Sequence, residues 1–295
     1  MRVTTAMLVN TVVRDLEDRL TKMAKRQEEL SSGRRLNRPS DDPGGVVSAL
    51  RFRARLAENL QYKRNMDDAI AWLNTTDAAL REAVSTLQRV REIAVAGSNQ
   101  TLPAESLEAL AKEVAQLKAH LGDVANTDYA GRYIFAGTKT QTPPYDPGTG
   151  TWNGTSDILE YEIAPGVTIS VNIDGQAVFD SATLPKVFQV LDDLITNLQN
   201  GDAGSISNTR IGEIDQNIDN ILAVLAEVGA RVNRLEMAKG RMETTDVDLT
   251  NLLAQVEDTD MAQALMDLKS QENVYRAALA VGARIIQPSL VDFLR

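Results

Sequence analysis

The sequence contains no cysteine and a single histidine, His120, among its 295 residues. The absence of cysteine excludes a disulfide framework, thiol catalysis and any cysteine-ligated metal site. A single histidine also argues against a multi-histidine zinc site and against a Ser-His-Asp triad. Because His120 lies beside an apolar helical stripe rather than on it, we interpret it as a partly exposed structural residue. The sequence therefore predicts no catalytic, cofactor-binding or metal-binding residue, and we do not expect an enzyme.

Aromatic residues are also scarce, at 4% of the chain, whereas aliphatic residues and alanine dominate an apolar fraction of 43%. Such a composition is typical of helical bundles and coiled coils. No apolar run approaches the roughly 18 residues of a membrane span. The opening residues also lack the continuous apolar stretch of a secretory signal peptide. We therefore expect neither membrane insertion nor a cleaved signal.

The charge is unevenly distributed along a chain whose formal net charge is −10. Residues 140–230 carry 13 acidic side chains and two basic ones, whereas the first 40 residues carry nine basic and five acidic side chains. A positive segment could bind nucleic acid or acidic lipid. However, acidic residues are interleaved with the basic ones and no aromatic residues accompany them. We interpret this segment as a solvated helix face and expect no nucleic-acid partner.

Apolar residues recur with alternating spacings of four and three at both ends of the chain, which predicts helices that pack along a narrow stripe. The N-terminal stripe consists of Val9, Val13, Leu16, Leu20, Met23 and Leu30. The C-terminal stripe consists of Met261, Leu265, Leu268, Tyr275, Leu279, Ile286 and Phe293. Two such helices facing each other leave apolar residues over, namely Leu8, Val12, Met266 and Ile285. A surplus of this kind is typical of an oligomer interface, so both stripes are predicted to serve assembly.

Two breaks separate these terminal stripes from longer inner stripes, the first of which includes Met66, Leu73, Leu80 and Leu87. The first follows Gly33, which suits the left-handed position after a helix, and either Ser40 or Asp42 can cap the next helix. The second break lies at residues 257–260. Here the regular spacing of the apolar stripe that begins at Ile211 is interrupted, and it resumes out of phase at Met261. A coiled-coil stutter and a hinge between two bodies explain this phase change equally well.

Gly229 lies inside the same long stripe, where glycine costs about 1 kcal/mol relative to alanine. A packing reason would offset this cost. We therefore expect a close approach between two helices at Gly229.

Between the two helical halves, apolar residues recur at every second position, which predicts short strands. Alternation occurs around residues 131–137, 159–163 and 167–173, and Asp174-Gly175 predicts a hairpin turn before a last strand. Residues 138–183 are thus predicted to form a small β insertion that leans on the helices. Because its strands are local, we expect that it can be replaced by a short linker without loss of the helical fold. The predicted fold is mainly α, with N- and C-terminal halves paired as long coiled-coil helices.

Five short motifs resemble those of bacterial flagellins and flagellin-like axial proteins, and they occur in the same order. The N-terminal motif contains Ser31, Ser32, Gly33 and Arg34, with Asp41 and Asp42 after it. The C-terminal motif at residues 228–234 contains Gly229, Asn233 and Arg234. The remaining motifs are residues 87–92, 256–260 and 293–295. The opening residues, residues 39–43 and residues 131–138 resemble members that join hook and filament, whereas the C-terminal third is closer to filament flagellin.

The resemblance implies a structural axial protein that joins a hook-side junction protein to the flagellin filament. Filament-forming flagellin is the alternative, and a non-flagellar coiled-coil protein is a weaker one. The implied build is an elongated rod in five segments. These are an inner-layer helix (1–42), half of the rod (43–137), an outward β domain (138–183), the other half of the rod (184–256) and a second inner-layer helix (257–295).

The resemblance also implies the partners and the location of the chain. The expected partners are the other junction protein, flagellin, further copies of the same chain in a ring, and a cytoplasmic export chaperone that holds the C-terminal stripe. Export would occur through the flagellar secretion channel to the flagellum. No cofactor is implied.

Overall fold

A computed structural model describes residues 5–286, most of which are helical. The helices are α1 (Thr5–Ser32), α2 (Pro43–Gly97), α3 (Ala104–Ala125), α4 (Gly175–Phe179), α5 (Val187–Asn200), α6 (Ala203–Ser205), the π-helix η1 (Ile206–Arg210), α7 (Ile211–Glu257) and α8 (Met261–Ile286). The strands are β1 (Asp128–Tyr129), β2 (Arg132–Tyr133), β3 (Tyr145–Asp146), β4 (Thr151–Trp152), β5 (Glu160–Ala164) and β6 (Val167–Ser170). The mainly α fold with short strands between two helical halves is confirmed.

The chain forms two compact units, and each contains residues from both halves of the sequence. Unit 1 combines Met1–Glu58 with Thr244–Arg295, and unit 2 is Asn59–Glu243. The long helices α2 and α7 contribute to both units. The predicted pairing of the N- and C-terminal halves is therefore confirmed within each unit.

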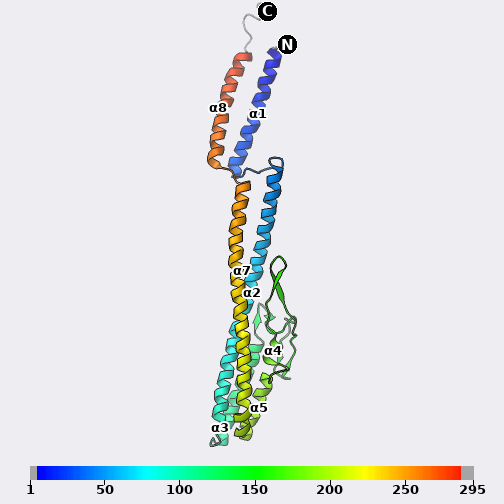
Figure 1. Cartoon of the computed structure of the whole chain (residues 1–295), viewed down its shortest axis with the longest axis vertical. Coiled ribbons are helices and arrows are strands. Elements are labelled where there is room, and N and C mark those ends of the chain that lie inside the picture. The colour runs from blue at the N-terminus through cyan, green and yellow to red at the C-terminus, as the bar shows by residue number, and fades with distance from the viewer. Residues whose placement is uncertain (1–4, 287–295) are drawn as a thin grey trace, which may run out of the picture. The chain divides into compact units, whose positions relative to one another are not determined.

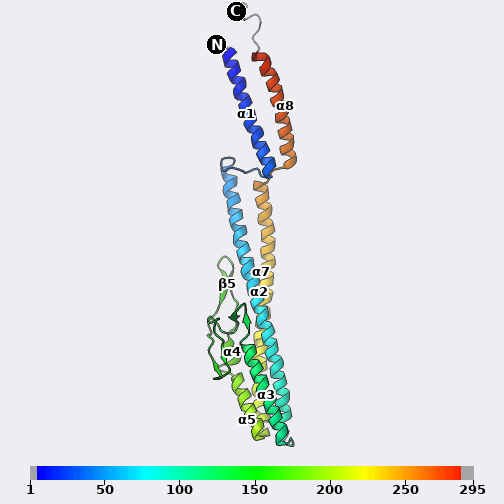
Figure 2. The ribbon, with the colours of Figure 1, turned by 180° about the vertical axis from the view of Figure 1, so that it is seen from behind.

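Unit 2 contains the hydrophobic core of the described residues. The predicted stripe of α2 supplies Met66, Leu73, Leu80 and Leu87, all of which are fully buried. Helices α3 and α5 pack along each other (Figure 2). The main contributions of α3, α5 and α7 to this core are Leu121, Leu191, Leu194, Leu198, Ile214, Ile221, Val228 and Leu235. Removal of these side chains from water supplies the main favourable term for folding.

The strands form three separate antiparallel pairs, β1–β2, β3–β4 and β5–β6. The predicted strand at residues 131–137 is wrong beyond Tyr133. Ala130 and Gly131 have φ values of 52° and 76°, and this tight turn folds β2 back onto β1. The predicted strand at residues 167–173 likewise ends at Ser170. Beyond it, the amide of Val171 still donates to the carbonyl of Leu159 at 2.9 Å, but the amide of Leu159 donates to the side chain of Asn172 at 2.8 Å.

The predicted hairpin turn at Asp174-Gly175 is wrong, because this dipeptide begins the helix α4. The carboxylate of Asp174 accepts a hydrogen bond from the amide of Gln176 at 2.9 Å and thereby caps the helix. A side chain that satisfies a free amide in this way favours a helix start over a hairpin. Val178 and Phe179 are buried as a result.

An aromatic cluster joins the strand region to the helices. The ring of Phe179 lies 5.3 Å from that of Phe135 and 5.7 Å from that of Trp152, measured between ring centroids. Tyr145 of β3 stacks on Phe188 of α5 with centroids 3.7 Å apart. The prediction that the strand region leans on the helices is confirmed. Because the two share one core, this packing argues against the expectation that residues 138–183 can be replaced without loss of the helical fold.

Both predicted breaks are real ends of helices. Gly33 follows α1 with a φ of +70°, in the left-handed region as predicted. Of the two candidate caps, Asp42 is the one used, because its carboxylate accepts a hydrogen bond from the amide of Gly45 at 3.0 Å. Pro43, the residue after this cap, is the first residue of α2.

On the C-terminal side, α7 ends at Glu257 and a new helix begins at Met261. The carboxylate of Asp260 caps α8 by accepting a hydrogen bond from the amide of Gln263 at 3.0 Å. The phase change at residues 257–260 is therefore an interruption between two helices and not a stutter in a continuous one.

Candidate assembly interface

In unit 1, α1 and α8 lie side by side and antiparallel (Figure 1). The predicted interface residues fall into two sets on this pair. The partly buried set is Val9, Leu16, Met23, Leu30, Leu268 and Tyr275. The exposed set, with 44–51% of each residue exposed, is Val13, Leu20, Met261, Leu265 and Leu279. Ile286 is the last residue of α8, and Phe293 lies outside the described residues.

Further exposed apolar residues extend the exposed set. Met266 is 61% exposed, as expected for a residue left over from the stripes, whereas Val12 is half-buried against α8. Val274 and Val281 are exposed but were not predicted, because they lie off the main stripe of α8. Their spacing of one heptad is the signal that could have identified them.

Unit 1 has almost no apolar core of its own. Among its described residues, the only buried apolar side chains are those of Ala49 and Ala264. Ordering the backbone costs about 1–2 kcal/mol per residue, and apolar burial is the main term that offsets this cost. In the single chain, unit 1 therefore has little apolar burial to offset the ordering cost of its helices.

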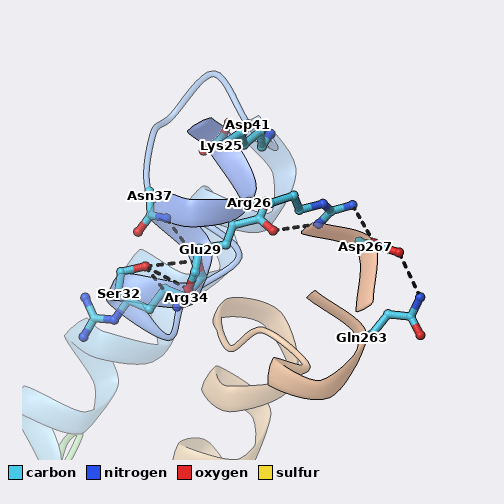
Figure 3. A network of polar contacts seen from close by, with 9 residues as sticks. All are labelled: Lys25, Arg26, Glu29, Ser32, Arg34, Asn37, Asp41, Gln263 and Asp267. Atoms are coloured by element: carbon cyan, nitrogen blue, oxygen red, sulfur yellow. Dashed lines mark hydrogen bonds and ion pairs between the residues drawn. The ribbon is translucent and has the colours of Figure 1, made fainter. Parts of the chain in front are cut away.

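The most buried charged side chain of α1 belongs to Glu29, and it is part of a polar network between α1 and α8 (Figure 3). Arg26 donates to the Glu29 carboxylate at 2.6 Å and forms an ion pair with Asp267 of α8 at 3.3 Å. The side chain of Gln263 donates to the other oxygen of Asp267 at 3.2 Å. Polar contacts thus join α1 to α8 in addition to the apolar residues of the partly buried set.

A second part of the network holds the linker after α1. The ammonium of Lys25 lies 2.8 Å from the carboxylate of Asp41, which also accepts a hydrogen bond from the amide of Arg38 at 2.9 Å (Figure 3). These contacts lower the pKa of Asp41, and the hydrogen bond from Lys25 has the largest effect. Within the turn, the amide of Arg34 donates to the hydroxyl of Ser32 at 3.1 Å, and the Ser31 hydroxyl donates to a carbonyl of the preceding turn.

The structure brings two motifs from opposite ends of the sequence together. The amide of Arg35 donates to the carbonyl of Glu257 at 2.7 Å, and the amide of Thr259 donates to the carbonyl of Gly33 at 3.1 Å. Arg34 and Asp258 form an isolated antiparallel bridge. The linker after α1 is therefore paired, strand-like, with the break between α7 and α8.

Glu257 lies at the centre of this pairing. Its side chain is 5% exposed, and one carboxylate oxygen contacts both Arg34, at 2.8 Å from Nε, and Arg53 of α2. Arg35 also donates from its guanidinium to the carbonyl of Val256 at 2.9 Å, which satisfies an acceptor at the end of α7. Sequence reasoning placed Glu257 inside the motif at residues 256–260 but missed its contact with Arg53, because no local pattern connects the two residues.

The motif at residues 228–234 lies on α7 in unit 2. A β-carbon on Gly229 would meet no atom within 4 Å, so the expected close helix approach there is wrong for this chain. Asn233 and Arg234 are exposed. The neighbouring Arg231, which was not predicted, donates to the carbonyls of Ser170 and Asn172 at 3.2 and 3.0 Å and so ties α7 to the strand region.

No metal-binding arrangement of three or more histidine or carboxylate side chains occurs within residues 5–286. His120 is half exposed, with its Nε2 3.0 Å from the carboxylate of Glu82. In the same part of the chain, no helix has the length and hydrophobicity to cross a membrane. A surface cavity of about 480 Å³ lies between β3, β4 and α5, lined in part by Tyr145, Trp152 and Phe188.

Two family descriptions account for most of the chain. The bacterial flagellin N-terminal helical region matches residues 3–140, and the bacterial flagellin C-terminal helical region matches residues 211–294. The chain belongs to the bacterial flagellin family. Both halves of the family fold are thus present, in the order that the motifs indicate.

Individual flagellin-family proteins resemble the chain over most of its length. Flagellar hook-associated protein 3 of Escherichia coli is 26% identical over 94% of this chain and 95% of its own length. A flagellin of Halalkalibacterium halodurans is 27% identical over 85% of this chain and 91% of its own. A solved structure described as a flagellar hook-associated protein from Vibrio parahaemolyticus has the same fold. It has a TM-score of 0.70 and 23% identity, and it covers 74% of this chain and 100% of its own.

Proposed function

We propose that this chain is a structural junction protein of the bacterial flagellum, situated between a hook-side junction protein and the flagellin filament. The observation that supports this role is the extent of its similarity to flagellar hook-associated protein 3. That similarity spans 94% of the chain, so it includes most of the segment 141–210, which neither family description matches. Filament-forming flagellin is the second candidate, because a flagellin is similar over 85% of the chain.

In this proposal, α1 and α8 form the inner layer of an assembly, and their exposed apolar residues pack against neighbouring copies. Val13 and Leu20 on α1, and Leu265 and Leu279 on α8, are the side chains that such packing would bury. Burial contributes roughly 25 cal/mol per Å² of apolar surface, which would offset the ordering cost that unit 1 does not meet alone. The segments 1–42 and 257–295 would thus be the assembly helices, 43–137 and 184–256 the rod, and 138–183 its outward β part.

The proposed role also specifies location and partners. The chain would leave the cell unfolded through the flagellar secretion channel, after a cytoplasmic chaperone has held the apolar stripe at residues 261–293. In the flagellum it would contact the other junction protein, flagellin and further copies of itself in a ring. A structural role requires no catalytic residue and no cofactor.

The copy number per flagellum tests this proposal against the alternative. Flagella would be purified and the chain quantified by mass spectrometry with isotope-labelled peptides, with the hook protein as an internal standard. A junction protein is expected in only as many copies per flagellum as form a single ring. Immunogold labelling should then mark only the boundary between hook and filament. Labelling along the filament would show that the chain is a flagellin. Absence from flagella would refute both roles.

A further inference from the structure

Glu257 is a buried carboxylate in a unit that has almost no hydrophobic core. Its side chain is 5% exposed, whereas the arginines that contact it, Arg34 and Arg53, have side chains 55% and 45% exposed. Both guanidinium groups converge on the same carboxylate oxygen. Two positive charges from different segments are therefore held close together by one negative charge.

The segments that meet at Glu257 are the ones that position the terminal helices. Arg34 belongs to the linker that leaves α1, Arg53 belongs to α2, and Glu257 is the last residue of α7, shortly before α8. Backbone pairing of residues 33–35 with 257–259 surrounds the carboxylate. The carboxylate thus connects the exit from α1 to the entry into α8 at a single point.

We propose that Glu257 is a positioning residue for assembly, which holds α1 and α8 as one body so that both helices face a second copy of this chain together. Loss of one partner from a buried ion pair leaves an uncompensated charge and is strongly destabilising. In unit 1, Ala49 and Ala264 are the only buried apolar side chains among the described residues, so the contacts of Glu257 add to the Arg26–Asp267 ion pair in keeping the two helices in register. The part played by the second copy rests on the proposed function, whereas the docking of α1 and α8 does not.

The test compares Glu257→Gln with a matched control, Glu58→Gln. Glu58 pairs with Arg55 one helical turn away on the same helix, with their charged atoms 3.3 Å apart and the Glu58 side chain 52% exposed. Such exposed pairs contribute little to stability. Both substitutions remove one carboxylate charge, but only Glu257→Gln weakens contacts between segments. The glutamine oxygen can still accept a hydrogen bond, whereas the negative charge that attracts both arginines is lost.

The first measurement is the rate of thermolysin cleavage in the linker, residues 33–42, of the full chain, with cut sites mapped by mass spectrometry. Because Arg34 and Arg53 are half exposed, we expect Glu257→Gln to raise this rate by about tenfold, and Glu58→Gln to leave it unchanged. Adding Arg53→Gln to Glu257→Gln should have little further effect, since the two side chains act as a pair. Glu257→Asp, which keeps the charge, should restore most of the protection.

Two controls keep the test decisive. The main thermal transition, followed by circular dichroism, should not change, because the core of unit 2 does not contain Glu257. If Glu257→Gln unfolds the whole chain, or if linker cleavage stays at the wild-type rate, the proposed positioning role is wrong.

The second measurement is filament attachment in cells that carry each variant as the only copy of the chain. Glu257→Gln should reduce attachment, and Glu58→Gln should not. Faster linker cleavage with normal attachment would show that Glu257 docks the helices but is not needed for assembly. If the wild-type chain is itself absent from flagella, faster cleavage of the Glu257→Gln linker would refute the proposed function and leave the docking role intact.

Discussion

Gly282 of α8 lies directly against Val12 of α1. A β-carbon on Gly282 would be 3.1 Å from Cγ1 of Val12, which is tighter than an ordinary van der Waals contact. The two helices are therefore in close contact here because Gly282 has no side chain. The close helix approach that the sequence suggested at Gly229 occurs instead at Gly282.

Gly282→Val should push α1 and α8 apart. The branched side chain would overlap Val12, and overpacking of this kind typically costs 1–3 kcal/mol. We expect faster proteolysis within α8 and an unchanged main thermal transition, since unit 2 has a separate core. The adjacent Ala283 is exposed, so Ala283→Val is the matched control and should have no effect on proteolysis.

Gly229→Ala should stabilise the chain. Open space surrounds this position, so the methyl group meets no neighbour and the helix gains up to about 1 kcal/mol from the better helix former. Urea unfolding of the purified chain measures the change as a higher midpoint. A lower midpoint would show that Gly229 has a packing role in the free chain.

Leu265→Asp should separate assembly from folding. Leu265 is 51% exposed in the single chain, so the carboxylate stays in water and the thermal transition should not move. In the assembled layer the same charge would be desolvated at a cost of several kcal/mol, and filament attachment should be lost. Ser270→Asp adds the same charge at an exposed polar position of α8 and should preserve attachment.

Leu268→Asp should affect both the docking of α8 and assembly, because Leu268 is already partly buried in the single chain. We expect faster proteolysis of α8 and loss of attachment, with the main thermal transition preserved. Unfolding of the whole chain would instead place the terminal helices in the core of the subunit.

Phe179→Ala should strongly destabilise unit 2. Phe179 is 1% exposed and packs on the rings of Phe135, Trp152 and Phe188. Deleting a buried aromatic ring typically costs about 3–5 kcal/mol, which denaturant unfolding would report. Ile158→Ala is the control, because Ile158 is 65% exposed and should tolerate the change. An unchanged unfolding free energy for Phe179→Ala would show that the strand region is dispensable after all.

Asp41 should make the linker after α1 sensitive to acid. Its pKa is lowered in the folded chain by Lys25 and by the amide of Arg38, so its contribution to stability is present above its ordinary pKa. That contribution is lost as the pH falls through the lowered folded value. The difference in linker hydrogen exchange between wild type and Asp41→Asn should therefore be large near neutral pH and vanish in acid. A difference that does not depend on pH would exclude the carboxylate charge as the cause.

Local patterns in the sequence predicted the helical architecture well. Heptad spacing predicted that Met66, Leu73, Leu80 and Leu87 share a buried face, and the residues around Gly33 predicted the end of α1. The same reasoning failed at residues 174–179, because a short Asp-Gly segment is compatible with either a hairpin turn or a helix cap. There the choice depends on whether the following side chains can be buried, as Phe179 is.

The sequence by itself determined that two narrow apolar stripes lie at the ends of the chain and that each is separated from a longer helix. Only the tertiary structure decided which stripe residues face each other and which stay exposed, as with Leu16 and Leu20 on α1. Periodicity identifies a face of a helix, but the position of the partner helix decides how much of that face is covered. The contact between Glu257 and Arg53 joins residues 204 positions apart. No local pattern encodes such a pair, because it exists only once both halves of the chain have folded together.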